Sequence, residues 1–501
     1  MISWKAIVPF VLALCALAPR AHAQASDTVT VGSRLPFSLE PHVLELIARL
    51  VNDNVFDTLV HRGPRHELEP ALATSWRVVT DTVLEFKLRR GVKFHNGDAL
   101  TPEDVKFSVE RTLDPSRKLT WQGQLRGVKE VQVLDGETLR LVTEKPFPAL
   151  LPRLAGFFIV PRKHVEKVGD QAFAAGPVGT GPWRFVEWKR DQHIRLEAFD
   201  GHWRGRPPFR HLVFRGIPDV STRLAELKTG GIDLVWWPPV DVIPDLARQS
   251  NLHISSVAGS RVHYVALDMR HPPFDNKLVR QAANHAIDKQ ALIQKLMAGR
   301  AVQTATVVAP IAFGYDADVP AYPYEPKKAR ELLAQAGYSN GVDITLHCAS
   351  GSYQSIFEAM GQMLTEVGIR TTTRRWEFGP AWWKFFQGEG KATNGYYWDL
   401  GNASLDADVP LYSLYHTEPG GWVGKWYTRT PGLDALIDQG RTIAATGQRQ
   451  RVYSQIQRLI HEEAPSIFLF AQHQTLAMSK RLEYQARPDE GLWMFDAKVK
   501  R

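Results

Sequence analysis

Hydrophobic and charged residues alternate one by one over Thr82–Arg89. This period of two predicts a strand with one buried face. A helix is predicted next, because Thr101-Pro102-Glu103-Asp104 supplies a hydroxyl cap, a proline in the first turn and acids near the positive end of the helix dipole. Asp135-Gly136 then separates two short alternating runs, as the turn of a hairpin does. The first third of the chain is therefore predicted to mix strands and helices.

The pattern changes after the stretch Gly176–Gly181, which is rich in glycine and proline and where we place a domain boundary. Strand-like runs follow at 183–188, 194–199, 212–214, 232–236 and 261–268, with a short helix at 221–228. Beyond residue 270 the apolar residues recur at helical spacing in three longer segments, 276–286, 326–336 and 355–366, and a strand-like run follows at 369–373. Helices that alternate with strands predict an α/β lobe.

The amino terminus has the pattern of a secretory signal peptide. Lys5 precedes an uncharged apolar run, Ala6–Ala18, and the small-residue site Ala21-His22-Ala23 follows it. We expect cleavage after residue 23, a mature chain that starts at Gln24, and export to the periplasm. Lipidation of Cys15 is not expected, because Leu14 stands where lipoprotein signals resemble one another in carrying a small residue.

Composition narrows the class of protein. The chain has 501 residues, 44% hydrophobic and 23% charged, which is typical of a folded protein with two or more domains. Its formal charge of +8 is spread along the chain without a basic run, so no nucleic-acid partner is predicted. Only Cys348 lies outside the leader, and no intrachain disulfide can form.

The search for chemistry finds no nucleophile elbow, zinc motif, redox Cys-x-x-Cys or phosphate-binding loop, and no cofactor is predicted. His461-Glu462-Glu463 is interpreted as a solvated helix end, and no metal site is predicted. Asp406 and Asp408 stand two apart in a predicted loop, where paired carboxylates either form a turn or bind a cation or amine. Trp236-Trp237, Trp382-Trp383 and Trp398 are core residues or the aromatic walls of a cleft for a polar ligand.

Three segments carry a family resemblance: Leu72–Trp76, Phe86–Gly97 and Thr101–Ser108. They match, almost residue for residue, the signature of the family 5 extracellular solute-binding proteins, the dipeptide, oligopeptide and nickel-binding group. Gly179-Thr180-Gly181-Pro182 and Ala286-Ile287-Asp288 resemble the same family. The resemblance implies two α/β lobes, with mixed sheets flanked by helices, joined by crossing strands that act as a hinge.

The same resemblance implies how the chain is divided. Lobe I is expected to comprise residues 24–44, 176–262 and 475–501. An additional N-terminal subdomain is expected over 45–175, and lobe II over 263–474.

Site residues are carried over position by position. In peptide-binding members an aspartate after a Trp-containing strand pairs with the ligand's ammonium group, and Asp406 lies at the matching place with Asp408 beside it. Ala407 stands where the family motif has proline. Trp398 and Trp422 are predicted walls of the cleft by position, and Trp383 is a predicted ligand contact as one of the aromatic residues named above.

Dipeptide-specific members carry an arginine just before the helix that corresponds to 355–366, where it receives the ligand's carboxylate. The stretch His347–Tyr353 has none, so strict dipeptide specificity is not expected. His347 is a candidate ligand of a metal chelate or a carboxylate, or else a structural histidine.

The chain is thus expected to be a periplasmic binding component of an ABC importer, monomeric and without enzymatic activity. It would capture a small polar, peptide-like solute and pass it to a permease in the inner membrane. A receptor for a metal chelate, an opine or a glycoside, and an exported hydrolase, remain as alternatives.

Overall fold

One large sheet runs through the whole molecule. The computed structural model describes residues 27–63, 66–349, 351, 353–377, 379–385, 394–417 and 430–500. Within them an eleven-stranded sheet has the order β15-β14-β16-β12-β17-β11-β1-β10-β9-β8, and β13 pairs with β17. Its strands are β1 (Thr28–Ser33), β8 (Trp183–Lys189), β9 (His193–Ala198), β10 (His211–Gly216), β11 (Leu234–Trp236), β12 (Leu252–Leu267), β13 (Ala301–Gln303), β14 (Val342–Ala349), β15 (Ile369–Trp376), β16 (Gly395–Leu400) and β17 (Ser466–Ser479).

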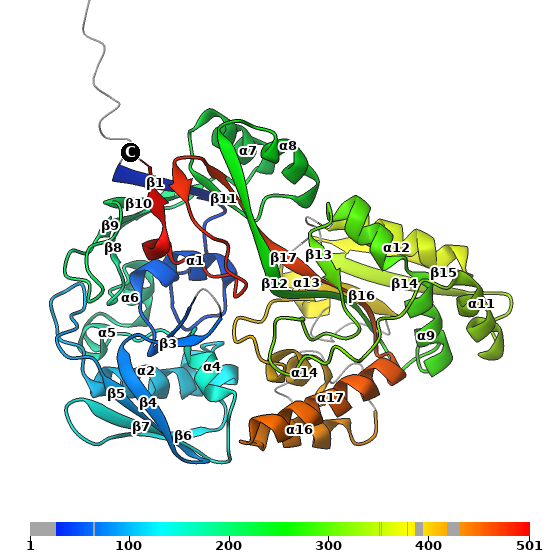
Figure 1. Ribbon diagram of the computed structural model, residues 1–501, viewed down its shortest axis with the longest axis horizontal. Helices are drawn as coiled ribbons and strands as arrows, with labels where there is room; N and C mark the ends of the chain where they lie inside the picture. Colours follow the sequence, from blue (N-terminus) through cyan, green and yellow to red (C-terminus); the bar gives the residue numbers. More distant parts are fainter. Residues whose placement is uncertain are drawn as a thin grey trace, which may run out of the picture.

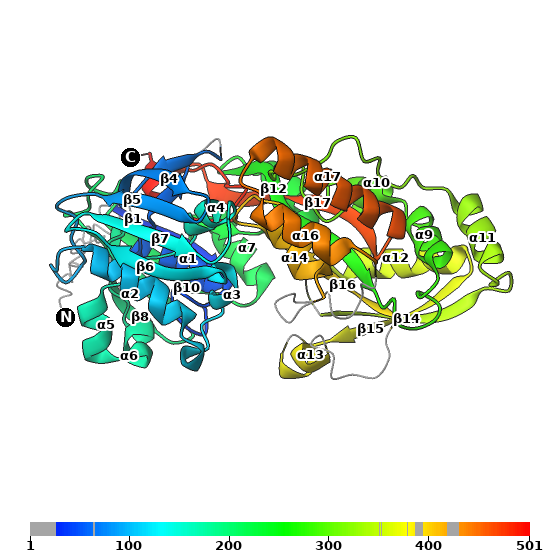
Figure 2. The same cartoon turned by 90° about the horizontal axis from the view of Figure 1, so that it is seen from below.

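Two long antiparallel strands, β12 and β17, connect the two lobes (Figures 1 and 2). Their pairing extends from Leu252 opposite Ser479 to Ala266 opposite Ser466. At one end β17 also pairs with β11, and at the other end β12 pairs with β16. The register shifts between Ala258 and Arg261, so an irregularity bends the ribbon where it passes from one lobe to the other.

Lobe I packs its part of the sheet against α1 (Leu46–Val55), α5 (Arg162–Val168), α6 (Asp170–Ala175), α7 (Val220–Thr229) and α8 (Ile243–Ala247). A smaller layer lies beside it, with the four-stranded antiparallel sheet β4-β5-β7-β6 and its own buried apolar cluster. Its elements are β2 (Val60–Arg62), β3 (Leu68–Pro70), β4 (Ala73–Thr80), β5 (Val83–Leu88), α2 (Pro102–Leu113), α3 (Gln122–Leu125), β6 (Val128–Val133), β7 (Thr138–Thr143) and α4 (Leu150–Leu154).

Lobe II buries apolar residues in two separate clusters. One cluster packs α9 (Lys277–Ala286), α11 (Pro326–Gln335) and α12 (Gln354–Glu366) on the sheet. The other includes α14 (Asp408–Tyr415), α16 (Leu433–Thr442) and α17 (Thr446–Glu463), with α13 (Pro380–Lys384) nearby. The remaining short elements are α10 (Lys289–Ala291), β18 (Leu482–Glu483) and β19 (Lys498–Val499).

Most of the predicted elements are confirmed. The alternating run at 82–89 is β5, the capped segment is α2, and Asp135-Gly136 joins β6 to β7. The Thr101 backbone N–H donates to the Asp104 carboxylate at 2.9 Å, which is half of the predicted capping interaction. The strand predicted at 261–268 is only the second half of β12. Its first half, Leu252–Gly259, lacks a continuous apolar pattern because it is only partly buried.

The Gly179-Thr180-Gly181 segment fits against the end of α1. A Cβ atom on Gly179 would lie 2.0 Å from the Val55 carbonyl oxygen, and one on Gly181 would lie 2.5 Å from the Val55 carbonyl carbon. Between them, the Thr180 hydroxyl donates to the Asp57 carboxylate at 2.9 Å. These glycines are therefore required by close backbone packing and not by a phosphate.

Gly179→Ala is expected to lower the free energy of unfolding by about 1–3 kcal/mol, since the backbone of α1 has to move away from the new methyl group. Gly123→Ala is the matched control, because a Cβ atom there meets nothing within 4 Å. Urea unfolding of both variants measures the difference. Equal stability of the two variants would contradict the packing argument.

Candidate functional site between the two lobes

A charged cluster lies where the hinge strands cross. Arg261 on β12 donates to both carboxylate oxygens of Glu490, at 2.6 and 2.7 Å, and also to Asp399 on β16. Its guanidinium lies 4.6 Å from the centre of the Trp237 ring. Glu490 belongs to the carboxyl-terminal segment that packs on lobe I, so Arg261 ties both lobes to the hinge.

Two further contacts cross from the N-terminal layer to lobe II. Arg153 of α4 forms a buried ion pair with Asp408, the first residue of α14. Arg62, at the end of β2, donates to the Ser404 carbonyl oxygen at 2.7 Å. Figure 1 shows α4 and α14 facing each other between the lobes. In both of these contacts the N-terminal layer supplies the arginine.

Asp406 is almost completely buried, with 2% of its surface exposed. Arg449 of α17 donates to both of its oxygens, at 2.7 Å each, and the Asp408 backbone N–H donates to Oδ1 at 2.9 Å. Burial alone would lower the pKa of Arg449, but the Asp406 carboxylate outweighs it and raises that pKa. Asp406 thus anchors the start of α14 and α17 together, in agreement with the turn-forming alternative.

Asp408 begins α14 and does not lie in a loop as predicted. Burial would raise the pKa of its carboxyl group, but Arg153, Arg441 and Arg449 together lower it. Arg441 of α16 lies 3.1 Å from Oδ1 and belongs to the same lobe as Asp408, whereas Arg153 comes from across the gap. Asp408 is therefore ionised and shared between the lobes.

A pocket of about 360 Å³ opens between these contacts. Both sides of the gap contribute to it, the N-terminal layer with Arg62, His66, Leu68, Pro148 and Pro152 and lobe II with Ile311, Phe313, Ser404, Leu405, Asp406, Ala444, Thr446 and Arg449. The apolar residues form much of the wall, and two arginines and one aspartate supply the charge. This composition suits a small solute with an apolar body and charged ends.

The predicted aromatic residues lie elsewhere: Trp236 and Trp237 belong to the apolar cluster of lobe I, and Trp382 and Trp398 to a cluster of lobe II. Trp398 stacks on Trp382, with ring centres 5.6 Å apart. His347 accepts a hydrogen bond from the Trp376 indole at 2.9 Å and packs on Phe385. Burial, helped by Arg374, lowers the pKa of His347 to about 4, so the ring is neutral at pH 7. Neither His347 nor Trp398 lines the pocket at Asp406. Trp422 and the side chain of Trp383 lie outside the described part of the chain.

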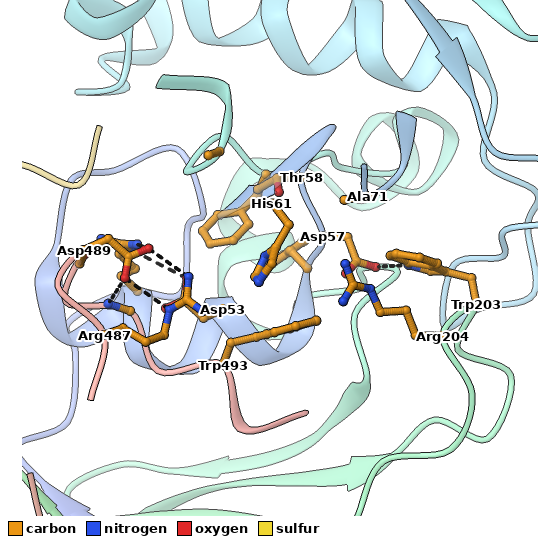
Figure 3. Close-up of a pocket in the computed structure, with 15 residues that line it drawn as sticks. Asp53, Asp57, Thr58, His61, Ala71, Trp203, Arg204, Arg487, Asp489 and Trp493 are labelled. Atoms are coloured by element: carbon orange, nitrogen blue, oxygen red, sulfur yellow. Dashed lines mark hydrogen bonds and ion pairs between the residues drawn. The ribbon is translucent and has the colours of Figure 1, made fainter. Parts of the chain in front are cut away.

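A second, smaller cavity lies behind β2 in lobe I (Figure 3). His61 is directed toward the Trp493 ring, with ring centres 4.1 Å apart, and Asp57 accepts from the Trp203 indole at 3.0 Å. Asp489 pairs with Arg487 at 3.1 Å and with Arg49 at 3.6 Å. Because Asp489, Arg487 and Arg49 are paired with one another, we interpret this cluster as structural support for β2.

Three residues of the site were missed from the sequence: Arg62, Arg153 and Arg449. Arg153 and Asp408 are 255 positions apart, and Arg449 and Asp406 are 43 apart. Arginine on a helix is ordinarily exposed, and no local pattern marks these three as buried. Their positions near the ends of helices and strands therefore did not identify them as site residues.

Several alternative sites lose support. Among the described residues, no group of three His, Cys, Asp or Glu side chains could hold a metal ion. His461-Glu462-Glu463 ends α17 as interpreted and Glu462 is exposed, but the His461 ring is half-buried and stacks on Tyr322 with ring centres 4.3 Å apart. The prediction that the sequence holds no Gly-x-Ser-x-Gly spacing was wrong, because Gly337-Tyr338-Ser339-Asn340-Gly341 has the spacing of a nucleophile elbow. It leads from α11 into β14, whereas an elbow leads from a strand into a helix.

No helix within the described ranges is long and apolar enough to cross a membrane. This finding concerns those residues alone.

Comparison with known proteins gives a consistent result. The family model described as bacterial extracellular solute-binding proteins, family 5 Middle, matches residues 67–422. Heme-binding protein A of Haemophilus influenzae is 30% identical over 436 residues, which cover 80% of this chain and 78% of that protein. Glutathione-binding protein GsiB of Escherichia coli strain K12 is 28% identical over 505 residues, 98% of each chain.

Solved structures have the same fold. The ABC transporter-associated periplasmic binding protein DppA from Helicobacter pylori, in complex with peptide STSA, has a TM-score of 0.85 and 26% identity over 96% of this chain and 99% of that one. The binding protein AgaA from Agrobacterium, in complex with agropinic acid, has a TM-score of 0.81 and 26% identity over 95% of this chain and 99% of that one. The predicted two-lobed α/β fold is confirmed.

Asp406→Asn is expected to lower the free energy of unfolding by about 3–5 kcal/mol, because it leaves the Arg449 guanidinium buried without its counter-ion. Asp343→Asn is the control, since its pair with Arg370 is exposed and contributes at most about 1 kcal/mol. Urea titration measures both. A loss in Asp406→Asn no larger than in the control would show that the buried pair does not stabilise the fold.

Arg153→Gln is expected to favour a more open arrangement of the lobes, because it removes the ion pair that crosses the gap. Arg441→Gln removes a partner of the same carboxylate from within lobe II and should leave the arrangement unchanged. Spin labels at Asp81→Cys and Glu331→Cys, both exposed and on opposite lobes, report the distance by pulsed electron spin resonance. The same distance distribution in both variants would contradict a cross-lobe role for Arg153.

Proposed function

The chain belongs to the bacterial extracellular solute-binding proteins of family 5, and we propose on this basis that it captures a small polar, peptide-like solute between its lobes. It delivers the solute to the permease of an ABC importer in the inner membrane. The observation that carries this proposal is the pocket lined from both sides of the gap, with charged residues at its walls. The protein acts as a monomer in the periplasm, after removal of residues 1–23.

Capture works by closure. A solute that touches both lobes stabilises the closed arrangement by the difference between its affinities for the two arrangements. The β12–β17 ribbon supplies the flexible connection, and the register shift near Ala258 is the natural place for bending. Arg62 and Arg153 then meet Ser404 and Asp408 across the gap. The permease recognises the closed form.

A peptide-like solute is supported by the relatives and by the charges of the pocket. The relative with 98% coverage is a glutathione-binding protein by name, and a structural relative holds a peptide. Asp406 is the proposed partner of the solute's ammonium group. Within the described residues its Oδ2 accepts one hydrogen bond, from Arg449, so one acceptor position remains. Asp408, Trp398, Trp383, Trp422 and His347 stay predicted ligand contacts.

A non-peptide solute is the second candidate. It is favoured by the relatives named for heme and for agropinic acid. Both candidates describe a receptor without catalytic activity, which releases its solute unchanged, whereas an exported hydrolase would release products.

A thermal-shift screen of refolded, ligand-stripped protein separates these candidates. The panel contains dipeptides, longer peptides, glutathione, opines, sugars, heme and nickel chelates. A solute at about 100 times its dissociation constant adds about 2.7 kcal/mol of stability, which raises the melting temperature clearly. We expect hits among the peptides, and chromatography of the bound solute should recover it intact.

Hits confined to sugars, heme or chelates would discard the peptide proposal and keep the receptor. Recovery of cleaved products would contradict the receptor itself. A panel without any hit, with protein shown to be folded, would overturn the proposed function.

A further inference from the structure

Among the charged residues that the structure describes in the pocket wall, Arg62 alone has no carboxylate within ion-pair distance, and we infer that it is the counter-ion for a carboxylate group of the solute. The inference rests on the proposed function and deepens it. It assigns the solute to the carboxylate-bearing class, and it places that group at the end of β2.

The burial of Arg62 supports this assignment. Only 6% of the residue is exposed, yet no carboxylate of the described residues lies within ion-pair distance of its guanidinium. Its two hydrogen bonds go to backbone carbonyl oxygens, of His66 and of Ser404, at 2.7 Å each. The buried Nε finds no acceptor among the described residues. Of its five N–H groups, three therefore have no acceptor among the described residues.

The other charges of the pocket cancel. Arg449 and Asp406 neutralise each other through two parallel hydrogen bonds. His66 is neutral at pH 7, since partial burial and the nearby arginines lower its pKa. Burial lowers the pKa of Arg62, and the carboxylates of Asp489 and Asp406 act against this, but each of them is already paired with another arginine, so Arg62 has no ion-pair partner of its own. A buried arginine in this state is destabilising by itself and is stabilised when an anion enters.

The backbone of Arg62 is fixed by its neighbours, and its guanidinium is held by the carbonyl oxygens of His66 and Ser404. Arg62 lies on β2, opposite Leu68 of β3. Arg487 donates to the Arg62 carbonyl oxygen at 2.8 Å, and Arg487 is itself paired with Asp489 in the cavity behind β2 (Figure 3). A planar guanidinium in a fixed position matches the two oxygens of a carboxylate.

Arg62 is not the arginine of the dipeptide-specific relatives. Those relatives carry theirs just before the helix that corresponds to 354–366, almost 300 positions later in the chain. That stretch has no arginine here. Arg62 supplies the same chemistry from the opposite side of the gap, next to Asp406 in the same pocket. A peptide-like solute would then place its ammonium group near Asp406 and its carboxylate on Arg62.

The test uses matched pairs of probes on the mature protein: the peptide Ser-Thr-Ser-Ala and its carboxyl-terminal amide, and glutathione and its diethyl ester. Isothermal titration calorimetry measures each dissociation constant. The wild type is expected to bind the acid of a pair about 10-fold to 100-fold more tightly than its neutral derivative, as is typical of a charged hydrogen-bonded pair.

Arg62→Gln should abolish this preference by weakening the acid alone, and Arg62→Lys should keep part of it because the charge remains. Arg77→Gln, at an exposed pair with Glu85, is the matched control and should bind as the wild type does. Thermal melts establish that each variant is folded. If Arg62→Gln does not fold, the comparison of Arg62→Lys with the wild type tests the inference.

Equal affinity of the wild type for acid and neutral derivative would overturn the inference and leave the receptor proposal standing. The inference is also overturned if a folded Arg62→Gln variant still binds the acid more tightly than its neutral derivative. If neither form of either probe binds and every hit of the thermal screen is neutral or cationic, the inference is also overturned. If no solute of any class binds, the proposed function itself fails.

Discussion

Each lobe buries its apolar residues against its own part of a single sheet, and the two parts are joined through the hydrogen bonds between β12 and β17. The other features of the molecule depend on this constraint. Because the ribbon is continuous, the lobes cannot separate, and they can only rotate about its irregular middle. Contacts that cross the gap therefore form between fixed partners, such as Arg153 with Asp408 and Arg62 with Ser404. The hinge therefore determines which charged side chains face a solute in the gap.

The sequence predicted local elements well where one face of an element is buried. The alternation in β5 and the capped start of α2 lead directly to the observed bounds, because burial and capping act over a few residues. The length of β12 was not predictable in this way. Its first half pairs with β17, more than 200 positions later, and carries a mixed set of partly buried residues. Pairing with a distant strand imposes the strand conformation there, and local preference does not.

The site also depends on contacts between segments that are far apart in the sequence. The family resemblance marked Asp406 and Asp408 by position, yet both carboxylates are engaged by arginines from distant helices. Only the folded chain brings Arg449, Arg153 and Arg62 to one pocket, and nothing around them in the sequence distinguishes them from surface arginines. The aromatic residues predicted for the cleft include Trp398, which packs instead in a cluster with Trp382. Side-chain type alone does not separate a cleft wall from a core.

Asp408 has two arginine partners, one from each side of the gap. An ion pair that joins two bodies usually makes their separation costly, since one buried charge is left without compensation. Here Arg441 belongs to the same lobe as Asp408 and would stay with it if the lobes parted, whereas Arg153 would move away with the other lobe. The carboxylate is thus never stranded during the opening motion. The contact can therefore hold the lobes together without leaving a buried carboxylate unpaired when they part.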